Sequence, residues 1–349
     1  MYISARREVL EEELDPSLTS NEINMQKWPA IYQTAIPQSG TNQVPLLKPY
    51  SCTFSTAVAA ITDALLSAKF PLILAGNSGR NTATIPLLTS LSSKLAIALF
   101  MACPSVVSVP FDHPHFLGVS FGGPNPLLAE ADVILILDVD VPWIDTAGNA
   151  PRSDAKVFVL DPDPLKQTYG WSHVDADLVC RADAEVALQQ LLDAVGTASS
   201  RIDISTITMR AQQLAARHSE LIAKLESAEA NLTDAAVAEP AFVIATLREV
   251  VAAKTPSRGS KTLWLNEGIS AYPAVFDHVR PSVPGSMIAS GGSSLGWALG
   301  AAVGAGVGVR GKHELMVAVV GDGTFLFGVP SAAYWMARRY DTVCSSHMM

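Results

Sequence analysis

The sequence has few charged residues and no run of basic ones. Charged side chains make up 16% of its 349 residues, against about 25% in a typical soluble domain. Its 24 Lys and Arg residues are outnumbered by 33 Asp and Glu, which gives a formal net charge of −9. Proteins that bind a phosphate backbone need a basic stripe, so nucleic acid is not an expected partner. The hydrophobic fraction of 49% excludes wholesale disorder and supplies apolar material for about two domains.

Cysteines are also scarce, and none of them forms a CxxC pair. The four are Cys52, Cys103, Cys180 and Cys344. This spacing argues against a disulfide scaffold and against a zinc ribbon, and it fits a reducing compartment. The N-terminal segment 1–16 lacks the apolar core of a signal peptide, so we expect a cytoplasmic protein.

One uncharged stretch, 288–309, is long enough to span a bilayer. It consists mostly of Gly, Ala and Ser, whose burial removes little area from water, so insertion would be unfavourable and no membrane partner is expected. Glycine recurs in it at every fourth position, at Gly292, Gly296, Gly300, Gly304 and Gly308. We expect a helix of a water-soluble fold, with a bare face that lets another backbone or a ligand approach closely.

Continuous apolar runs alternate with helical patterns between residues 51 and 196. The runs that read as strands are Pro71–Ala75, Leu95–Phe100, Val133–Leu137, Val157–Leu160 and Leu178–Cys180. Apolar residues at helical spacing occupy Phe54–Lys69 and Ala184–Val195. Strands that are apolar along their whole length and alternate with helices predict a parallel sheet covered on both faces. This part of the chain is therefore expected to be a Rossmann-like α/β domain.

The other segments give weaker patterns. Residues 1–50 read as a linker after a possible strand end, and 197–260 as a helical connection. A second α/β unit begins at 261, with strands at Thr262–Leu265 and Leu315–Val320 and a helix at Ser331–Arg339. A parallel fold needs another strand after that helix. The polar tail that begins at Cys344 lacks the apolar pattern of one, so we expect this second sheet to be incomplete.

Two features of the second unit point to chemistry. Asp322 stands between Gly321 and Gly323 directly after a buried strand, where open α/β sheets bind ligands and where a carboxylate can reach Mg²⁺. Upstream, the segment 291–294 precedes the glycine-rich helix, whose free backbone N–H groups and dipole would suit a phosphate. Each feature alone is equally typical of a turn or loop that binds no ligand. Together they predict a metal–diphosphate site.

The same residues resemble a known family. The text GGSSLGWALGAAVGAGVG, followed by VAVVGDGTFLFGVPSAAYWMARRYD, closely resembles the cofactor domain of thiamine-diphosphate enzymes of the acetolactate synthase and benzoylformate decarboxylase type. PLILAGNSGR, FDHPHFLG and AKVFVLDPDP resemble the family's middle domain, and MYISARREVLEEE resembles the end of its N-terminal pyrimidine-binding domain. The resemblance implies four parts: a remnant of that domain with a linker (1–50), a middle domain (51–196), a helical connection (197–260) and a truncated cofactor domain (261–349).

The resemblance also implies an activity and a site. It implies thiamine diphosphate and Mg²⁺ as cofactors, a 2-oxo acid as substrate, decarboxylation or carboligation as the reaction, and a homodimer or homotetramer. Asp322 would bind Mg²⁺ and bridge it to the diphosphate. The other residues expected to border the cofactor are Gly291, Gly292, Ser293, Leu295, Gly321, Gly323 and Thr324. The role of Glu267, at the end of the first strand, stays open. Relatives can hold FAD in the middle domain, and no motif here decides whether this chain does.

Two functional groups of the family have no counterpart in the sequence. The proton-transferring Glu belongs to the N-terminal domain, so no catalytic residue is assigned, and the second side-chain metal ligand has no match in the tail. We therefore expect this chain alone to be inactive or nearly so. Two alternatives are a non-catalytic relative that keeps the middle domain for binding or oligomerisation, and an unrelated nucleotide-binding protein. Gly76–Arg80 reads as a strand–helix turn, and Asp112, His113 and His115 as a structural loop.

Overall fold

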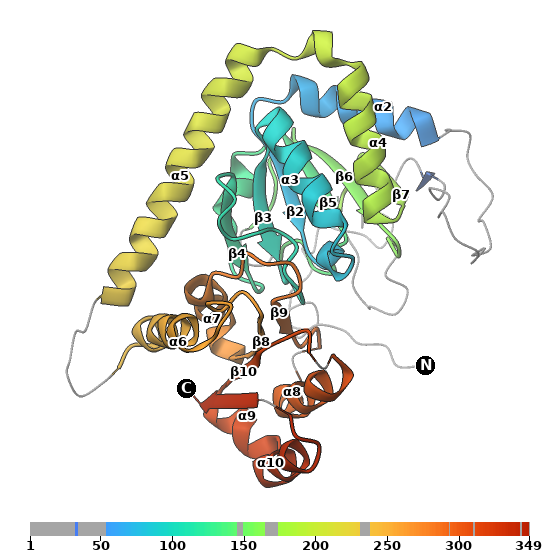
Figure 1. Ribbon diagram of the computed structural model, residues 1–349. Helices are drawn as coiled ribbons and strands as arrows, with labels where there is room; N and C mark the ends of the chain where they lie inside the picture. Colours follow the sequence, from blue (N-terminus) through green and yellow to red (C-terminus); the bar gives the residue numbers. More distant parts are fainter. Residues whose placement is uncertain are drawn as a thin grey trace, which may run out of the picture.

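The computed structural model describes residues 32–33, 54–144, 149–164, 174–230, 238–292, 294–309, 311–342 and 344–348. The possible strand end at Tyr2–Ser4 lies outside these residues. The described chain forms two parallel sheets, one above the other in Figure 1, with helices packed on them. No helix in these ranges is both long and apolar enough to cross a membrane.

The first sheet has seven parallel strands in the order β1-β7-β6-β5-β2-β3-β4. They are β1 (Tyr32–Gln33), β2 (Pro71–Ala75), β3 (Ala98–Ala102), β4 (Phe116–Ser120), β5 (Val133–Leu137), β6 (Lys156–Asp161) and β7 (Leu178–Arg181). From β2 the chain builds outward through β3 and β4, then returns to β5 on the other side of β2 and continues to β7. This reversal makes the sheet doubly wound, which agrees with the predicted Rossmann-like class.

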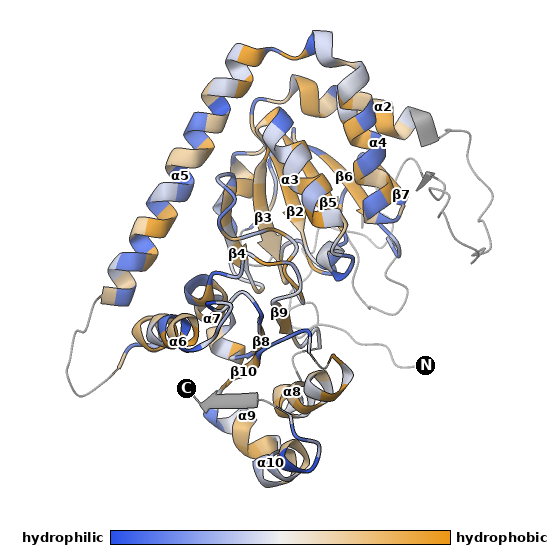
Figure 2. Ribbon diagram, in the orientation of Figure 1, coloured by the Kyte–Doolittle hydropathy of each residue, from blue (hydrophilic) through white to orange (hydrophobic). Residues whose placement is uncertain are grey.

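Alternate residues of these strands face opposite sides of the sheet. Ile73, Leu99 and Leu135 pack in the core under the helices α2 (Phe54–Ser67), α3 (Thr84–Leu95) and α4 (Ala184–Thr197). Leu72 and Ile134 belong to a second core on the other face. Both sides are buried, which explains why the strands are hydrophobic along their whole length (Figure 2). The predicted parallel sheet covered on both faces is therefore confirmed.

One predicted strand boundary is wrong for a local reason. The apolar run Leu95–Phe100 contains the end of α3 as well as the start of β3. Leu95 is the last residue of α3, and Ala96 ends the helix in a left-handed conformation with φ of 48°. Hydrophobicity is continuous across this turn because both elements face the same core, so the pattern alone does not separate them.

The second sheet has four parallel strands in the order β11-β10-β8-β9. They are β8 (Thr262–Glu267), β9 (Met287–Ala289), β10 (Leu315–Val320) and β11 (Cys344–Met348). The expectation that the polar tail forms no strand is wrong, because the backbone of β11 pairs with β10 over five residues. A parallel ladder is made by backbone groups, so it does not require the apolar side chains on which the prediction rested.

Helices cover both faces of this sheet as well. Leu265 and Met316 face α8 (Trp297–Gly308), while Trp264 and Val319 lie in the core that contains residues of α7 (Tyr272–Val279). The remaining helices are α5 (Ile204–Ala230), α6 (Pro240–Lys254), α9 (Asp322–Phe327) and α10 (Pro330–Arg339). The helical connection predicted between the two α/β units thus consists mainly of α5 and α6.

Aromatic side chains join the two sheets into one core. The ring of Phe276, on α7, lies 6.1 Å from that of Phe111 and 6.4 Å from that of Phe116 on β4. Ser105 extends the contact, because its carbonyl accepts a hydrogen bond of 2.9 Å from the N–H of Ala289 on β9. The start of β4 and the segment after β3 therefore pack against α7 and β9 of the second unit.

The long helix α5 runs beside the first sheet, where it contacts β4, and its end contacts α6 and α7 of the second unit (Figure 1). Its Arg210 side chain is buried and donates hydrogen bonds to the carbonyl groups of Ala68, Leu95 and Ala96, where α2 and α3 end. These helix C-termini carry partial negative charge, which stabilises the buried guanidinium. Burial lowers the pKa of Arg210 from its ordinary value.

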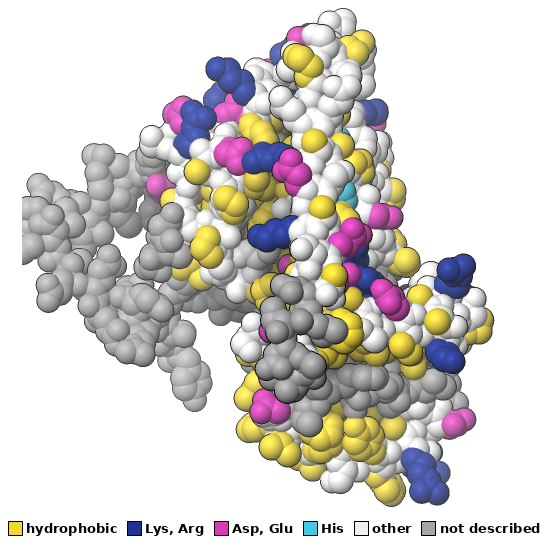
Figure 3. Space-filling view, turned by 90° about the vertical axis from the view of Figure 1, so that its left-hand side faces the viewer, with side chains coloured by type: hydrophobic (Ala, Val, Ile, Leu, Met, Phe, Trp, Pro, Cys, Tyr) yellow, Lys and Arg dark blue, Asp and Glu magenta, His cyan; other side chains and the backbone are white. Residues whose placement is uncertain are grey.

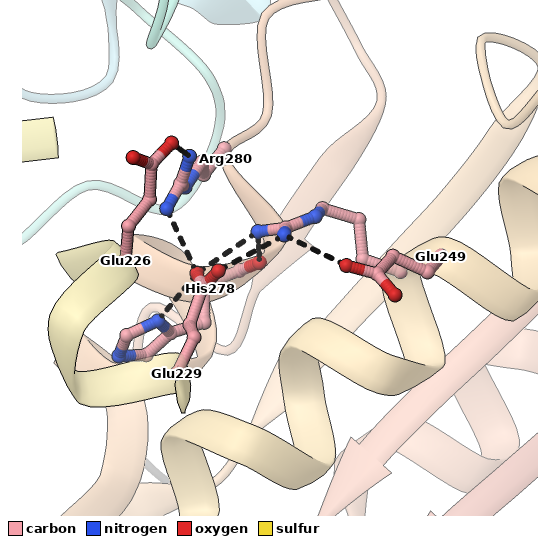
Figure 4. A network of polar contacts seen from close by, with 6 residues as sticks. Glu226, Glu229, Glu249, His278 and Arg280 are labelled. Carbon is pink, nitrogen blue, oxygen red and sulfur yellow. Dashed lines mark hydrogen bonds and ion pairs between the residues drawn. The ribbon is translucent and has the colours of Figure 1, made fainter. Parts of the chain in front are cut away.

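The far end of α5 is held by a network of charged groups (Figure 4). Glu229 accepts hydrogen bonds from Arg248 of α6 at 3.1 Å, from His278 of α7 at 2.9 Å and from Arg280 at 2.9 Å. Burial alone would raise the pKa of Glu229, but the hydrogen bonds from Arg248 and His278 and the two arginine charges lower it. The network fixes three helices around one carboxylate.

Asp277, on α7, is a half-buried acid that generates a pH prediction. Burial raises its pKa from 3.8 to about 7, against the opposing charges of Lys224 and Arg280. A raised pKa leaves the folded state undisturbed below pH 3.8 and costs stability increasingly as pH rises towards 7, because the unfolded state loses its proton first. Asp277→Asn should therefore be more stable than the wild type by about 2–4 kcal/mol at pH 8 and equal to it near pH 4.

Urea unfolding at the two pH values measures this difference. Asp193→Asn, at an exposed acid on α4, is the matched control and should be neutral at both. A destabilised or pH-independent Asp277→Asn variant would contradict the assignment.

Candidate cofactor site

Three strands of the second sheet end at one edge. β9, β8 and β10 are parallel neighbours with β8 in the middle, so their carboxyl ends, at Ala289, Glu267 and Val320, lie side by side. We call this row of strand ends the carboxyl edge of the second sheet. The segment 291–292 follows β9, and the segment 321–324 follows β10. The structure therefore brings the two predicted glycine segments to the same edge, on either side of Glu267.

Asp322 begins the short helix α9. Gly321 precedes the helix with an extended backbone, and Asp322 is exposed, with Oδ1 accepting a 2.7 Å hydrogen bond from the N–H of Gly323. Thr324 is buried beneath them, and its hydroxyl oxygen lies 3.7 Å from the point where a Cβ on Gly321 would stand. An exposed carboxylate at this place can receive a hard cation without first being taken out of water.

The other predicted residues lie on the β9 side of the edge. Gly291 and Gly292 are exposed, and a Cβ added to either would meet no described atom closer than 4.0 Å. The side chain of Leu295 is 41% exposed. Ser293 lies outside the described residues. Packing within the described chain does not explain this pair of glycines or the exposed leucine.

The helix that follows does not offer all its first donors to a ligand. α8 begins at Trp297, and the N–H groups of Trp297 and Ala298 donate to the two carboxylate oxygens of Glu267, at 2.9 Å and 2.6 Å. The expectation that this helix N-terminus presents free amides to a phosphate is therefore wrong for these two groups. The carboxylate occupies the position that an anion would take.

Glu267 is the functional candidate whose role the sequence left open. Leu263 and Leu265 of β8 face α8, and Glu267 continues that alternation to the same side. Its side chain is fully buried. A charged residue at the core-facing position of a buried strand is a signal that sequence reasoning can use, because a carboxylate there needs backbone donors close by.

Only part of the glycine face approaches another backbone. A Cβ on Gly296 would lie 3.0 Å from the Cα of Gly328, at the end of α9. Among the described atoms, nothing lies within 4 Å of the corresponding point on Gly300, Gly304 or Gly308. The predicted close approach thus holds at Gly296, where α8 and α9 meet, and not at Gly300, Gly304 or Gly308. Gly306, outside this series, is packed against the side chain of Thr342.

Two β-branched residues beside the site have positive φ angles. Ile269, two residues after β8, has φ of 50°, and Val329, after α9, has φ of 47°. Such a conformation is an outlier for a β-branched residue and costs of order 1–3 kcal/mol. Strain of this kind gathers at functional sites, where the surrounding structure holds it. Its presence on both sides of the edge supports a site there.

The two other segments considered in the sequence, 112–115 and Gly76–Arg80, have structural roles. His115 is buried and lies 3.0 Å from the Ser92 hydroxyl, and burial lowers the pKa of His113 to about 4. In the described ranges no group of three metal-ligating side chains is close enough to hold an ion. The Gly76–Arg80 segment is a turn, as predicted. Its Gly79 is packed against the backbone of Val107 and donates to the Ser108 hydroxyl at 2.9 Å.

The two parallel sheets, each covered by helices on both faces, define the class of α/β proteins in which ligands bind at the carboxyl ends of the strands. Two family models match the chain: "Thiamine pyrophosphate enzyme, central domain" over residues 58–191 and "Thiamine pyrophosphate enzyme, C-terminal TPP binding domain" over residues 269–344. The chain belongs to the thiamine pyrophosphate (thiamine diphosphate) enzyme family.

Individual relatives match part of their own length. The putative thiamine pyrophosphate-containing protein YdaP of Bacillus subtilis (strain 168) is 31% identical over 151 residues, which are 42% of this chain and 25% of that protein. Benzoylformate decarboxylase from Polynucleobacter necessarius superposes with a TM-score of 0.62 at 20% identity, over 88% of this chain and 54% of the other. A 4-hydroxybenzoylformate decarboxylase from Rhodococcus jostii RHA1 superposes with a TM-score of 0.62 at 20% identity. The match covers 86% of this chain and 53% of the other.

These comparisons set the scope of the inference. The chain spans about half the length of the solved relatives and a quarter of the curated one. At such identities the solved structures show the fold, which agrees with the predicted class. Which residues bind the cofactor, and which reaction follows, are proposals.

The contact between α8 and α9 gives a test of the site's architecture. Gly296 has φ of 89°, and a Cβ there would press against Gly328. Gly296→Ala should lower the free energy of unfolding by about 2–4 kcal/mol, because it combines a left-handed backbone with overpacking. Gly300→Ala, one turn further along the same helix and in open space, should raise it by about 0.5–1 kcal/mol. Denaturant melts that rank the two variants in the opposite order would contradict the geometry.

Proposed function

We propose that this chain binds thiamine diphosphate through Mg²⁺ at Asp322 and belongs to an enzyme acting on 2-oxo acids. The observation that carries the proposal is the exposed carboxylate of Asp322 at the end of β10, within the part of the chain that matches the TPP-binding domain model. Carboxylate oxygen is a ligand that Mg²⁺ prefers, and Mg²⁺ commonly shares its ligands with phosphates. Gly321, Gly323 and Thr324 would lie against the diphosphate and the metal.

The residues of this chain would bind and orient rather than transfer protons. When bound, thiamine diphosphate would supply a carbon nucleophile and an electron sink for the reaction of a 2-oxo acid. Asp322 would hold the metal, and the exposed Leu295 would contact the ring from the β9 side. Gly291, Gly292 and Ser293 would border the cofactor there. No described residue is assigned the role of proton donor or acceptor.

The reaction and the domain plan are proposed at a coarser level. Two solved relatives are decarboxylases of aromatic 2-oxo acids by their names, which favours decarboxylation; an acetolactate synthase-like carboligation and the use of FAD remain alternatives. A non-catalytic relative that keeps the middle domain for binding is the competing function. The division of the chain into four parts, with boundaries at residues 50, 196 and 260, is also a proposal. So is a cytoplasmic location, which rests on the spacing of the cysteines.

Removal of the Asp322 carboxylate tests the metal assignment. Calorimetric titration of the purified chain with thiamine diphosphate should show binding that requires Mg²⁺. Asp322→Ala should weaken it by about a hundredfold or more, because loss of a ligand exceeds the 10–100-fold effect typical of an outer-shell partner.

Asp112→Ala is the matched control, since Asp112 is an exposed acid beside the alternative histidine cluster, and its affinity should equal that of the wild type. Equal affinity of Asp322→Ala and the wild type would reject the site. Binding of nucleotides in place of thiamine diphosphate would favour the competing class of function.

The surface of α9 and α10 supports association with a second copy. Leu326 is 74% exposed, Phe327 68% and Trp335 65%, and Tyr334 and Met336 add to the patch. Hydrophobic side chains gather over the lower part of the molecule in Figure 3, where Figure 1 places these helices. An apolar patch this close to the site is typical of a protein interface, and a homo-oligomer with closed symmetry would cover it.

Charge placed in this patch tests the association. Sedimentation velocity should show a dimer or tetramer for the wild type, and Trp335→Asp should shift it to the monomer, because a buried aromatic anchor contributes about 2 kcal/mol or more to such an interface. Met209→Asp, at an exposed apolar residue of α5, should leave the assembly intact. A wild type that stays monomeric at high micromolar concentration would reject this part of the proposal.

A further inference from the structure

Glu267 stands at the centre of the candidate site without a place in the proposed binding of the metal. Its carboxylate is fully buried, and both its oxygens accept hydrogen bonds from the first turn of α8. A buried ionised group is tolerated only where donors satisfy it. Here the donors are two backbone amides and the positive end of a helix, so the carboxylate and α8 hold each other in place.

The backbone of the same residue contacts the metal side of the site. Glu267 pairs with Val320 in the parallel ladder between β8 and β10, and its carbonyl accepts a 3.4 Å hydrogen bond from the N–H of Gly321. Gly321 is the residue before Asp322. One residue therefore joins the two halves of the edge: its side chain fixes the start of α8, and its main chain fixes the start of the Asp322 turn.

The charge of Glu267 has a consequence for where an anion can bind. The helix α8, of twelve residues, begins at this edge, and its N-terminus would by itself attract a phosphate. The N-terminus of α8 already carries a carboxylate, whose negative charge repels a second anion in that position. On the other side of Glu267, Asp322 is also negatively charged, but a divalent metal ion bound to it would make that position positive and so attractive to a diphosphate.

We propose that Glu267 is a positioning residue of the cofactor site. Its carboxylate occupies the N-terminus of α8, so an anion cannot bind there and the diphosphate binds beside Asp322 instead. It also fixes the turn before α8, which contains Leu295. The inference rests on the proposed function for its cofactor part. Its structural part, that Glu267 accepts the first N–H groups of α8 and so keeps other anions away from them, does not depend on the ligand and can be tested without the cofactor.

The carboxylate is the group that this role requires. Glutamine would present one oxygen and one NH₂ group, and the NH₂ would face an N–H donor of α8. Alanine would leave both amides without an acceptor, in a small space that a free carboxylate ion can enter. Glu314 is a matched control, because it also accepts a backbone N–H, from Ser257 at 3.0 Å, but stands beside the opposite end of β10.

Small carboxylates test the structural part. In Glu267→Ala, the amides of Trp297 and Ala298 should exchange faster with solvent than in the wild type. Acetate should slow this exchange again and raise the melting temperature by several degrees, because it replaces the missing acceptor. Acetate should have neither effect on the wild type or on Glu314→Ala. Unchanged amide exchange in Glu267→Ala, or an acetate response equal to that of Glu314→Ala, would overturn this part.

Cofactor titration tests the positioning part. Glu267→Gln should weaken Mg²⁺-dependent binding of thiamine diphosphate by about tenfold, the loss typical of a residue that orients a ligand-bearing turn. Acetate should restore part of the affinity of Glu267→Ala, and Glu314→Gln should bind like the wild type. Wild-type affinity in Glu267→Gln would overturn the positioning role. A wild type that does not bind thiamine diphosphate would overturn the proposed function with it, while the acetate experiment would still decide the structural part.

Discussion

The parallel register between β8 and β10 is the constraint on which the candidate site depends. It places Glu267 opposite Val320, so that the last residue of one strand stands beside the residue before the Gly321–Asp322 turn. Side chains alternate along a strand, and a slip of one residue would turn Glu267 from α8 towards α7 and leave its charge without donors. The burial of Leu263 and Leu265 under α8 fixes the register, and thereby fixes the site.

The rest of the fold holds this edge in place. The aromatic contact of Phe276 with Phe111 and Phe116 packs the second unit on the first, and α5 connects β4 of the first sheet with α6 and α7. The network around Glu229 ties the end of α5 to α6 and α7, on the opposite side of β8 from α8. Helices therefore hold the strands from both faces, while Gly291, Gly292 and Asp322, beyond the strand ends, are exposed. Rigid strands with exposed turns are what binding sites at the ends of parallel sheets require.

Most of the fold could be predicted from the sequence, because buried parallel strands are apolar along their length. Pro71–Ala75, Val133–Leu137 and Leu315–Val320 have the predicted bounds, and the parallel sheet covered on both faces follows from their alternation with helices. The start of β3 could not be predicted, since the end of α3 is equally apolar. β11 was missed because a polar strand at the edge of a sheet has no hydrophobic pattern to show.

The site was predictable in composition but not in arrangement. Spacing and resemblance indicated that Asp322 and the glycines at 291–292 belong together, and the sheet order places them at one edge. They did not reveal that Glu267 occupies the start of α8, because such a contact joins residues thirty positions apart through a helix whose first residue the sequence does not mark. The exposed apolar surface of α9 and α10 was equally hidden, since burial in an assembly and burial in a core require the same residues.

A crystal structure of the chain with thiamine diphosphate and Mg²⁺ would test the central claim most directly. We expect the metal on the carboxylate of Asp322, the diphosphate against Gly323 and Thr324, and Glu267 still hydrogen-bonded to the N–H groups of Trp297 and Ala298. A diphosphate seated on the α8 amides with Glu267 displaced, or a metal bound away from Asp322, would contradict that claim.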